Sequence, residues 1–64
     1  MTPKKTLAER QTELQSLLAT PAGHAELQVL ESRYAKASGK PRPSKRSIIT
    51  YILVFEREHG FLDG

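Results

Sequence analysis

Basic side chains are concentrated in one short segment of this 64-residue chain. Six of the ten lysines and arginines lie between positions 33 and 46, and no acid occurs from Ser32 through Phe55. The other four basic residues face seven acids, so the net charge of +3 divides into +6 in this segment and −3 elsewhere. A segment of this kind attracts anions, and a row of cations suits the repeated charges of a nucleic-acid backbone.

The basic segment predicts a phosphate-binding surface where a third helix begins. Free backbone N–H groups and the helix dipole favour an anion at such a position, and Ser44 or Ser47 could add a hydroxyl donor. If that helix entered a major groove, Arg46, Ser47 and Thr50 would lie nearest the base edges. The candidate nucleic-acid-binding residues, on DNA or RNA, are Arg33, Lys36, Lys40, Arg42, Lys45, Arg46, Ser47 and Thr50.

The same segment has other interpretations. A charged run in a loop rich in proline and glycine can be solvated surface that binds nothing. The stretch from Lys40 to Arg46 also looks like a nuclear-import signal, although such short matches are common. A helix-turn-helix comparison is weak because the turn from Ser38 to Pro43 is longer than usual and carries two prolines. Zinc-finger, RRM and basic-zipper patterns are absent from the sequence.

Residues suited to catalysis or metal binding are sparse. The chain has no cysteine and one aspartate, Asp63, and neither His24 nor His59 lies in a nucleophile-type turn. Glu56 and His59 have a spacing found in di-iron helix bundles, but those sites need two such motifs and further glutamates. A histidine in a last helical turn more simply interacts with free carbonyls. We therefore predict no enzyme activity, metal, cofactor or small-molecule substrate.

Two helices are predicted before the basic segment. The first runs from about Thr6 to Ala19, starts with a capping box at Thr6 and Glu9, and could start earlier at Thr2-Pro3. Its apolar stripe is Leu7, Leu14, Leu17 and Leu18. Thr20-Pro21 ends this helix and begins the second, which runs to about Ala37. The second stripe is Gly23, Leu27, Leu30, Tyr34 and Ala37, and Val29 lies off it.

The third element is the hardest to predict. Ile48 to Phe55 is rich in β-branched and aromatic residues, which favour a strand. A helix is favoured by Ser44 as a possible N-cap, by the 15-residue span from Lys45 to His59, and by Gly60 at the C′ position. A single strand would also lack a partner within the chain. We predict a helix whose wide apolar arc makes it the central element.

Together these elements predict an all-α fold, a small three-helix domain in which a helical hairpin packs on a central, largely apolar third helix. Residues 1–5 are predicted as an N-terminal arm, ordered or disordered, and residues 6–62 as the single domain. The longest apolar stretch has eight residues against the ~20 of a membrane span, so we expect no membrane role and a cytoplasmic location.

The alternative function is a protein-interaction or homodimer module without a nucleic-acid role. A domain this small and free of cysteine needs tight helix packing or association to be stable. Val29, Val54 and an exposed Phe61-Leu62 pair would then be contacts with a protein partner or a second copy.

Overall fold

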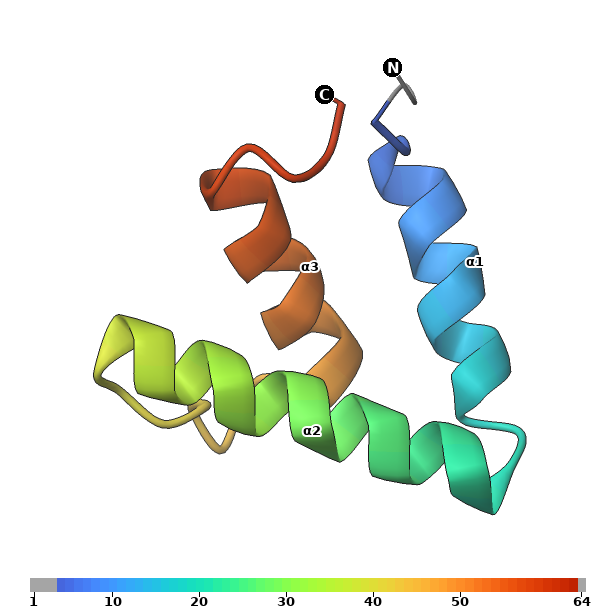
Figure 1. The fold of residues 1–64 in the computed structure, drawn as a ribbon, viewed down its shortest axis with the longest axis horizontal. Helices are drawn as coiled ribbons and strands as arrows, with labels where there is room; N and C mark the ends of the chain where they lie inside the picture. The colour runs from blue at the N-terminus through green and yellow to red at the C-terminus, as the bar shows by residue number, and fades with distance from the viewer. Residues whose placement is uncertain (1–3, 64) are drawn as a thin grey trace.

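The computed structural model describes residues 4–63, and they form three α-helices with no extended strand in that range. The helices are α1 (Leu7–Leu17), α2 (Pro21–Ser38) and α3 (Ile48–Glu58). Figure 1 shows α1 and α2 as two splayed arms of a hairpin, with α3 lying beside both. The predicted all-α, three-helix fold is confirmed. The suggested start at Thr2-Pro3 and the first three residues of the predicted arm lie outside the described residues.

Local capping defines α1 as predicted, but the helix ends two residues early. The Thr6 hydroxyl accepts a hydrogen bond from the Glu9 N–H at 3.2 Å, and the Glu9 carboxylate accepts one from the Thr6 N–H at 3.3 Å. After Leu17, three successive N–H groups bond carbonyls three residues back, which tightens the chain into a turn. Leu18 therefore lies outside the helix and is exposed, whereas Leu14 is fully buried.

Helix α2 has the predicted caps and extends one residue beyond Ala37. The Thr20 hydroxyl accepts the Gly23 N–H at 3.0 Å, and Gly39 ends the helix with φ +75°. Ala37 is exposed, so its predicted place on the buried stripe is wrong, while Gly23, Leu27 and Tyr34 are buried as predicted. The last turn of α2 thus extends past the core and leads the chain into the basic segment.

The third element is a helix, as predicted, but it starts at Ile48 rather than near Lys45. Ser47 is the N-cap, since its hydroxyl accepts the Thr50 N–H at 3.2 Å. Ser44 is not the cap because it lies in a turn closed by the Arg46 N–H on the Pro43 carbonyl at 3.0 Å. Gly60 follows the C-cap with φ +74°, as predicted. Helix α3 buries more side chains than either other helix, which agrees with its predicted central role.

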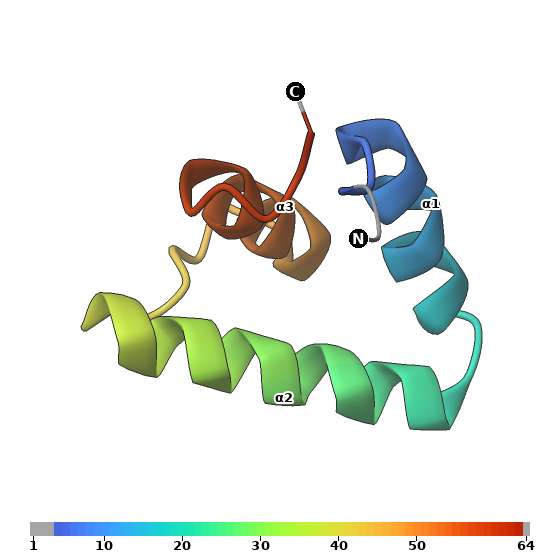
Figure 2. The same cartoon turned by 45° about the horizontal axis from the view of Figure 1, so that its top comes forward.

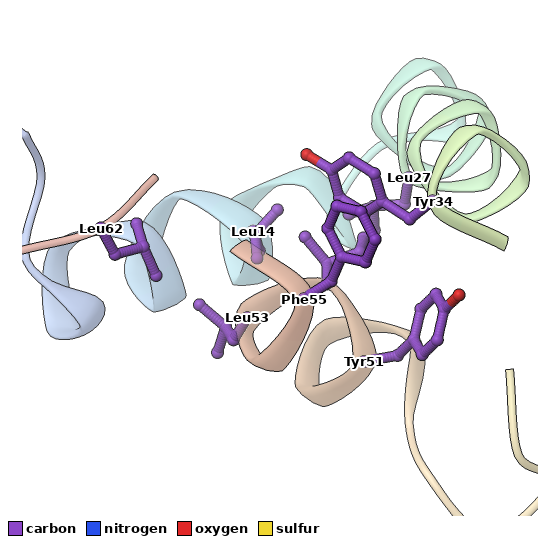
Figure 3. Close-up of a cluster of buried hydrophobic side chains, with 8 residues drawn as sticks. Leu14, Leu27, Tyr34, Tyr51, Leu53, Phe55 and Leu62 are labelled. Carbon is purple, nitrogen blue, oxygen red and sulfur yellow. The ribbon is translucent and has the colours of Figure 1, made fainter. Parts of the chain in front are cut away.

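The core contains one fully buried side chain from each helix: Leu14, Leu27 and Ile52. Figure 3 shows the surrounding cluster, in which the rings of Tyr34 and Phe55 lie face to face, with centroids 4.1 Å apart. The C-terminal segment closes this cluster with Leu62, which is buried. The predicted exposure of the Phe61-Leu62 pair is therefore correct only for Phe61, because the backbone turn at Gly60 sends Leu62 inward.

The C-terminal segment also runs beside the beginning of α1. The Asp63 N–H donates to the Lys5 carbonyl at 2.8 Å, and an isolated β-bridge pairs Thr6 with Asp63. Figures 1 and 2 both show this segment returning from the end of α3 toward the start of α1. The contact fixes the two ends of the described chain against each other.

A polar network links all three helices within this small core. Arg10 on α1 donates to both carboxylate oxygens of Glu56 on α3, from Nε at 2.8 Å and from a terminal nitrogen at 2.9 Å. The Tyr34 hydroxyl on α2 donates to the same carboxylate at 2.6 Å. Glu56 is only 4% exposed, so these donors take the place of water around its carboxyl group. Sequence reasoning missed the network, because it placed no polar residue in the core.

Because of this network, the free energy of unfolding is expected to decrease at high pH. Burial, followed by the hydrogen bond to Glu56, raises the pKa of Tyr34 to about 12, against about 10 for a free tyrosine. Because the folded-state pKa is the higher one, the contribution of Tyr34 to stability is complete below about pH 10 and is lost between about pH 10 and 12. Urea denaturation across that range is expected to show this loss, and Tyr34→Phe should flatten that part of the profile. An unchanged profile in Tyr34→Phe would contradict the assignment.

Candidate functional site

The predicted site residues lie mainly on the connection between α2 and α3. Gly39 turns the chain out of α2 in a left-handed conformation, and Pro41 and Pro43 restrict the backbone that follows. The Ser38 hydroxyl stabilises the turn by donating to the Lys40 carbonyl at 3.2 Å. Figure 2 shows the connection crossing from the end of α2 to α3. Two of its cations, Lys45 and Arg46, lie at the start of α3.

Arg42 has a different environment from the other cations of the connection. Its guanidinium forms an ion pair with Glu31 on α2 and donates to the Arg46 carbonyl at 2.6 Å. The chain reverses after Gly39, and this reversal places Arg42 beside Glu31, the acid just before the acid-free run. Arg42 thus fastens the connection to α2, and its charge is largely balanced. Counting acids by position along the chain could not reveal this pairing.

Three of the predicted cations remain exposed on the connection between α2 and α3. Lys40, Lys45 and Arg46 have no carboxylate within ion-pair distance among residues 4–63. An open hollow at the helix start brings together four of the predicted residues and is lined by Pro43, Lys45, Arg46, Ser47 and Thr50. The structure therefore places these four residues around one surface depression.

The hydroxyl groups at the helix start are partly occupied. Ser47 accepts from the Thr50 N–H and donates to the Thr50 hydroxyl oxygen at 2.9 Å. The backbone N–H groups of Ile48 and Ile49 have no partner inside the helix, as in any first turn. Together with the Thr50 hydroxyl proton, these N–H groups are free donors beside Lys45 and Arg46.

Arg33 and Lys36 lie apart from this hollow. Both are exposed on the last turns of α2 and line neither the hollow at the start of α3 nor the groove described next. They extend the positive surface along α2 but do not converge on the helix start. Of the eight predicted residues, four line the hollow and Lys40 lines the groove described next. Arg33 and Lys36 lie apart on α2, and Arg42 is paired with Glu31.

A groove of about 240 Å³ lies between the connection and α3. Five of its residues, from Tyr51 to His59, follow the helical spacing of one face of α3. Lys40 and Arg46 line it, and Arg46 also lines the hollow at the helix start. The complete lining is Ser38, Lys40, Pro41, Pro43, Arg46, Tyr51, Val54, Phe55, Glu58 and His59. Sequence reasoning missed this groove, whose only signal was the aromatic spacing from Tyr51 to His59.

Glu56 and His59 have the spacing of a di-iron motif, but each contacts different residues. Glu56 is held in the buried network, whereas the His59 ring stacks on Phe55 at 3.9 Å between centroids. His59 Nδ1 lies 2.9 Å from the Phe55 carbonyl, which can only accept, so this nitrogen carries the proton. Among residues 4–63, no three histidine or acidic side chains are grouped closely enough to hold a metal ion.

Comparisons with protein-family models, curated proteins and solved structures give no match to this chain. Within the described range, no helix is both long and apolar enough to cross a bilayer. Functional inference therefore depends on the charges, contacts and hollows of the chain itself.

Proposed function

We propose that the protein binds nucleic acid, with Lys40, Lys45 and Arg46 contacting phosphates around the start of α3. The observation that carries the proposal is that three exposed cations lie together on the connection into α3 without a carboxylate partner in the described part of the chain. Arg10 and Arg42, by contrast, are paired with glutamates. A binding role is proposed and no catalytic one.

Several cations around one helix terminus suit a phosphate backbone better than a single anion. The helix N–H groups add a fixed positive potential beside Lys45 and Arg46. Arg33 and Lys36 would contact more distant phosphates of the same strand. Three to five such contacts predict a slope of log affinity on log salt of about −3 to −5 on a duplex and about −2 to −3.5 on a single strand.

Single alanine substitutions provide the test of this surface. Arg46→Ala is expected to weaken binding to a labelled oligonucleotide about tenfold at low salt and to reduce the salt slope by about 1. Lys40, Lys45 and Arg46 changed together to alanine should abolish binding without unfolding the protein, because all three side chains are exposed. Fluorescence anisotropy at several salt concentrations measures both quantities, and circular dichroism confirms the fold.

Two matched arginines control for net charge. Arg57→Ala makes the same charge change at the far end of α3 and should leave binding within about twofold of wild type. Arg42→Ala should have a smaller effect than Arg46→Ala, because the charge of Arg42 is already balanced by Glu31. If all three variants lost the same amount of affinity, binding would depend on the net charge of the protein and not on the proposed surface. A wild-type protein that ignores nucleic acid at low salt would overturn the proposal.

Self-association is the second candidate, favoured by apolar side chains that the fold leaves in solvent. Val29 is 55% exposed and Phe61 is 54% exposed. Val29 lies on α2 and Phe61 lies after α3. Leu7 and Leu18, at the two ends of α1, are also exposed. Sedimentation at several concentrations separates the candidates: a concentration-dependent dimer with no nucleic-acid binding would favour this one.

A further inference from the structure

We propose that the groove beside α3 accepts one unpaired base, so that the nucleic acid bound by this protein is single-stranded. The inference rests on the nucleic-acid binding proposed above and specifies the class of ligand. It is carried by three features of the groove: an aromatic stack, a buried hydroxyl without a partner, and charges of opposite sign at its two ends.

The aromatic stack offers a surface suited to a base. The rings of Tyr34, Phe55 and His59 lie nearly parallel, with angles of 9° and 16° between successive planes. Phe55 is covered on both faces by its neighbours, whereas His59, the last ring of the stack, is exposed. Bases stack on an exposed aromatic ring whatever their identity, and proteins that bind single strands combine such rings with a basic surface that follows the backbone. Here the exposed ring of His59 and the cation Arg46 lie at opposite ends of one groove.

The wall of the groove contains an unsatisfied polar atom. Tyr51 is only 8% exposed, and its hydroxyl has no hydrogen-bond partner. Figure 3 shows the Tyr51 ring set apart from the stacked rings of Tyr34 and Phe55. A buried hydroxyl without a partner is unfavourable, and an apolar occupant would leave it so. A base edge carries both donors and acceptors, so a small opening of the connection would let it satisfy this hydroxyl.

The charges along the groove determine how such a ligand is oriented. Arg46 lies at the end where α3 begins, and Glu58 lies at the other, roughly 16 Å away along an eleven-residue helix. Lys40 lines the groove from the connection. Glu58 repels a phosphate but accepts hydrogen bonds from amino groups such as those on bases. The phosphate therefore belongs at the basic end, and a neutral ring with N–H donors lies deeper in the groove.

The size of the groove limits the ligand to one ring. About 240 Å³ is below the roughly 300 to 1,000 Å³ of typical small-molecule sites. In a duplex, the faces and pairing edges of each base are already engaged, so only an unpaired base can enter. A single strand thus places its phosphates on the cations and one base in the groove.

Four labelled probes of equal length test this proposal: single-stranded DNA, single-stranded RNA, duplex DNA, and a single strand of abasic DNA. The abasic strand retains the phosphates and lacks only the bases. Single-stranded DNA, single-stranded RNA or both are expected to bind about tenfold more tightly than the abasic strand. Whichever of the two binds more tightly shows whether the protein prefers deoxyribose or ribose. If the abasic strand or the duplex binds as tightly, the base-binding groove is overturned while the phosphate surface stands. If no probe binds, the proposed function itself fails.

Two groove variants give an independent test. His59→Ala should weaken binding of the intact single strand about tenfold and leave binding of the abasic strand unchanged. His24→Ala, an exposed histidine on α2, is the matched control and should bind as wild type. Tyr51→Phe removes the unpartnered hydroxyl, so its melting temperature should not fall, whereas its single-strand affinity should drop about threefold or more. Unchanged single-strand affinity in both groove variants would overturn the proposal.

Discussion

Replacing Gly23 by alanine is expected to destabilise the domain by about 3 kcal/mol or more, which is most of the stability of a chain this small. A Cβ atom at this position would lie 1.9 Å from the Leu17 carbonyl oxygen and 2.6 Å from its carbonyl carbon. These are backbone atoms, so no side-chain rotation relieves the overlap. Helices α1 and α2 would have to separate at the corner where they meet.

The sign of the stability change in Gly23→Ala shows whether helix propensity or steric overlap is the larger effect. Alanine is about 1 kcal/mol better than glycine inside a helix, so helix propensity alone predicts stabilisation. The steric term should win, because the overlap involves backbone. Urea denaturation followed by circular dichroism measures the difference.

Gly39→Ala is the matched control for this prediction. A Cβ at Gly39 meets nothing within 4 Å, and the only penalty is the left-handed backbone, about 1 to 2 kcal/mol. Gly23→Ala should therefore be clearly less stable than Gly39→Ala. A Gly23→Ala protein as stable as wild type would show that α1 and α2 do not approach this closely.

The second large effect is expected from Arg10→Met. The substitution keeps the apolar bulk of the side chain but removes both hydrogen bonds to the buried Glu56 carboxylate. Only Tyr34 then remains as a partner in the network. Leaving a buried charge unpaired costs about 3 to 5 kcal/mol; we expect about 3 because the Arg10 side chain keeps 20% exposure. Urea denaturation at neutral pH measures the loss.

A double variant tests whether that loss comes from the stranded charge. Arg10→Met combined with Glu56→Met replaces the ion pair by apolar groups, a change that is often nearly neutral. The double variant should therefore be more stable than Arg10→Met alone, although each substitution alone is destabilising. Because the Tyr34 hydroxyl loses its acceptor, the double variant should remain less stable than wild type. Simple additivity of the two losses would indicate that the side chains stabilise the fold independently.

The features that could be predicted from the sequence are those determined by neighbouring residues. Thr6 with Glu9, Thr20 with Pro21, and Gly39 mark helix ends through interactions within a few positions, and the structure has all of them. The start of α3 was misplaced because Ser44 and Ser47 are both acceptable caps locally. The turn at Pro43 decides between them.

Features that depend on chain reversal were not predicted. The pairing of Arg42 with Glu31 and the gathering of Arg10, Tyr34 and Glu56 join residues on different elements. A projection of a single helix shows which face is apolar but not which charge on another helix will meet it. The sequence locates the basic segment along the chain, but the pairing of Arg42 and the groove beside α3 appear only in three dimensions.

The most direct test of nucleic-acid binding is a chemical-shift titration of the isotope-labelled protein with a short single-stranded oligonucleotide at low salt. The proposal predicts that the amides from Lys40 to Tyr51, and that of His59, shift together and that added salt reverses the shifts. Amides in the turn between α1 and α2 should remain unchanged. No shift at low salt, or shifts centred on that turn, would contradict nucleic-acid binding at the start of α3.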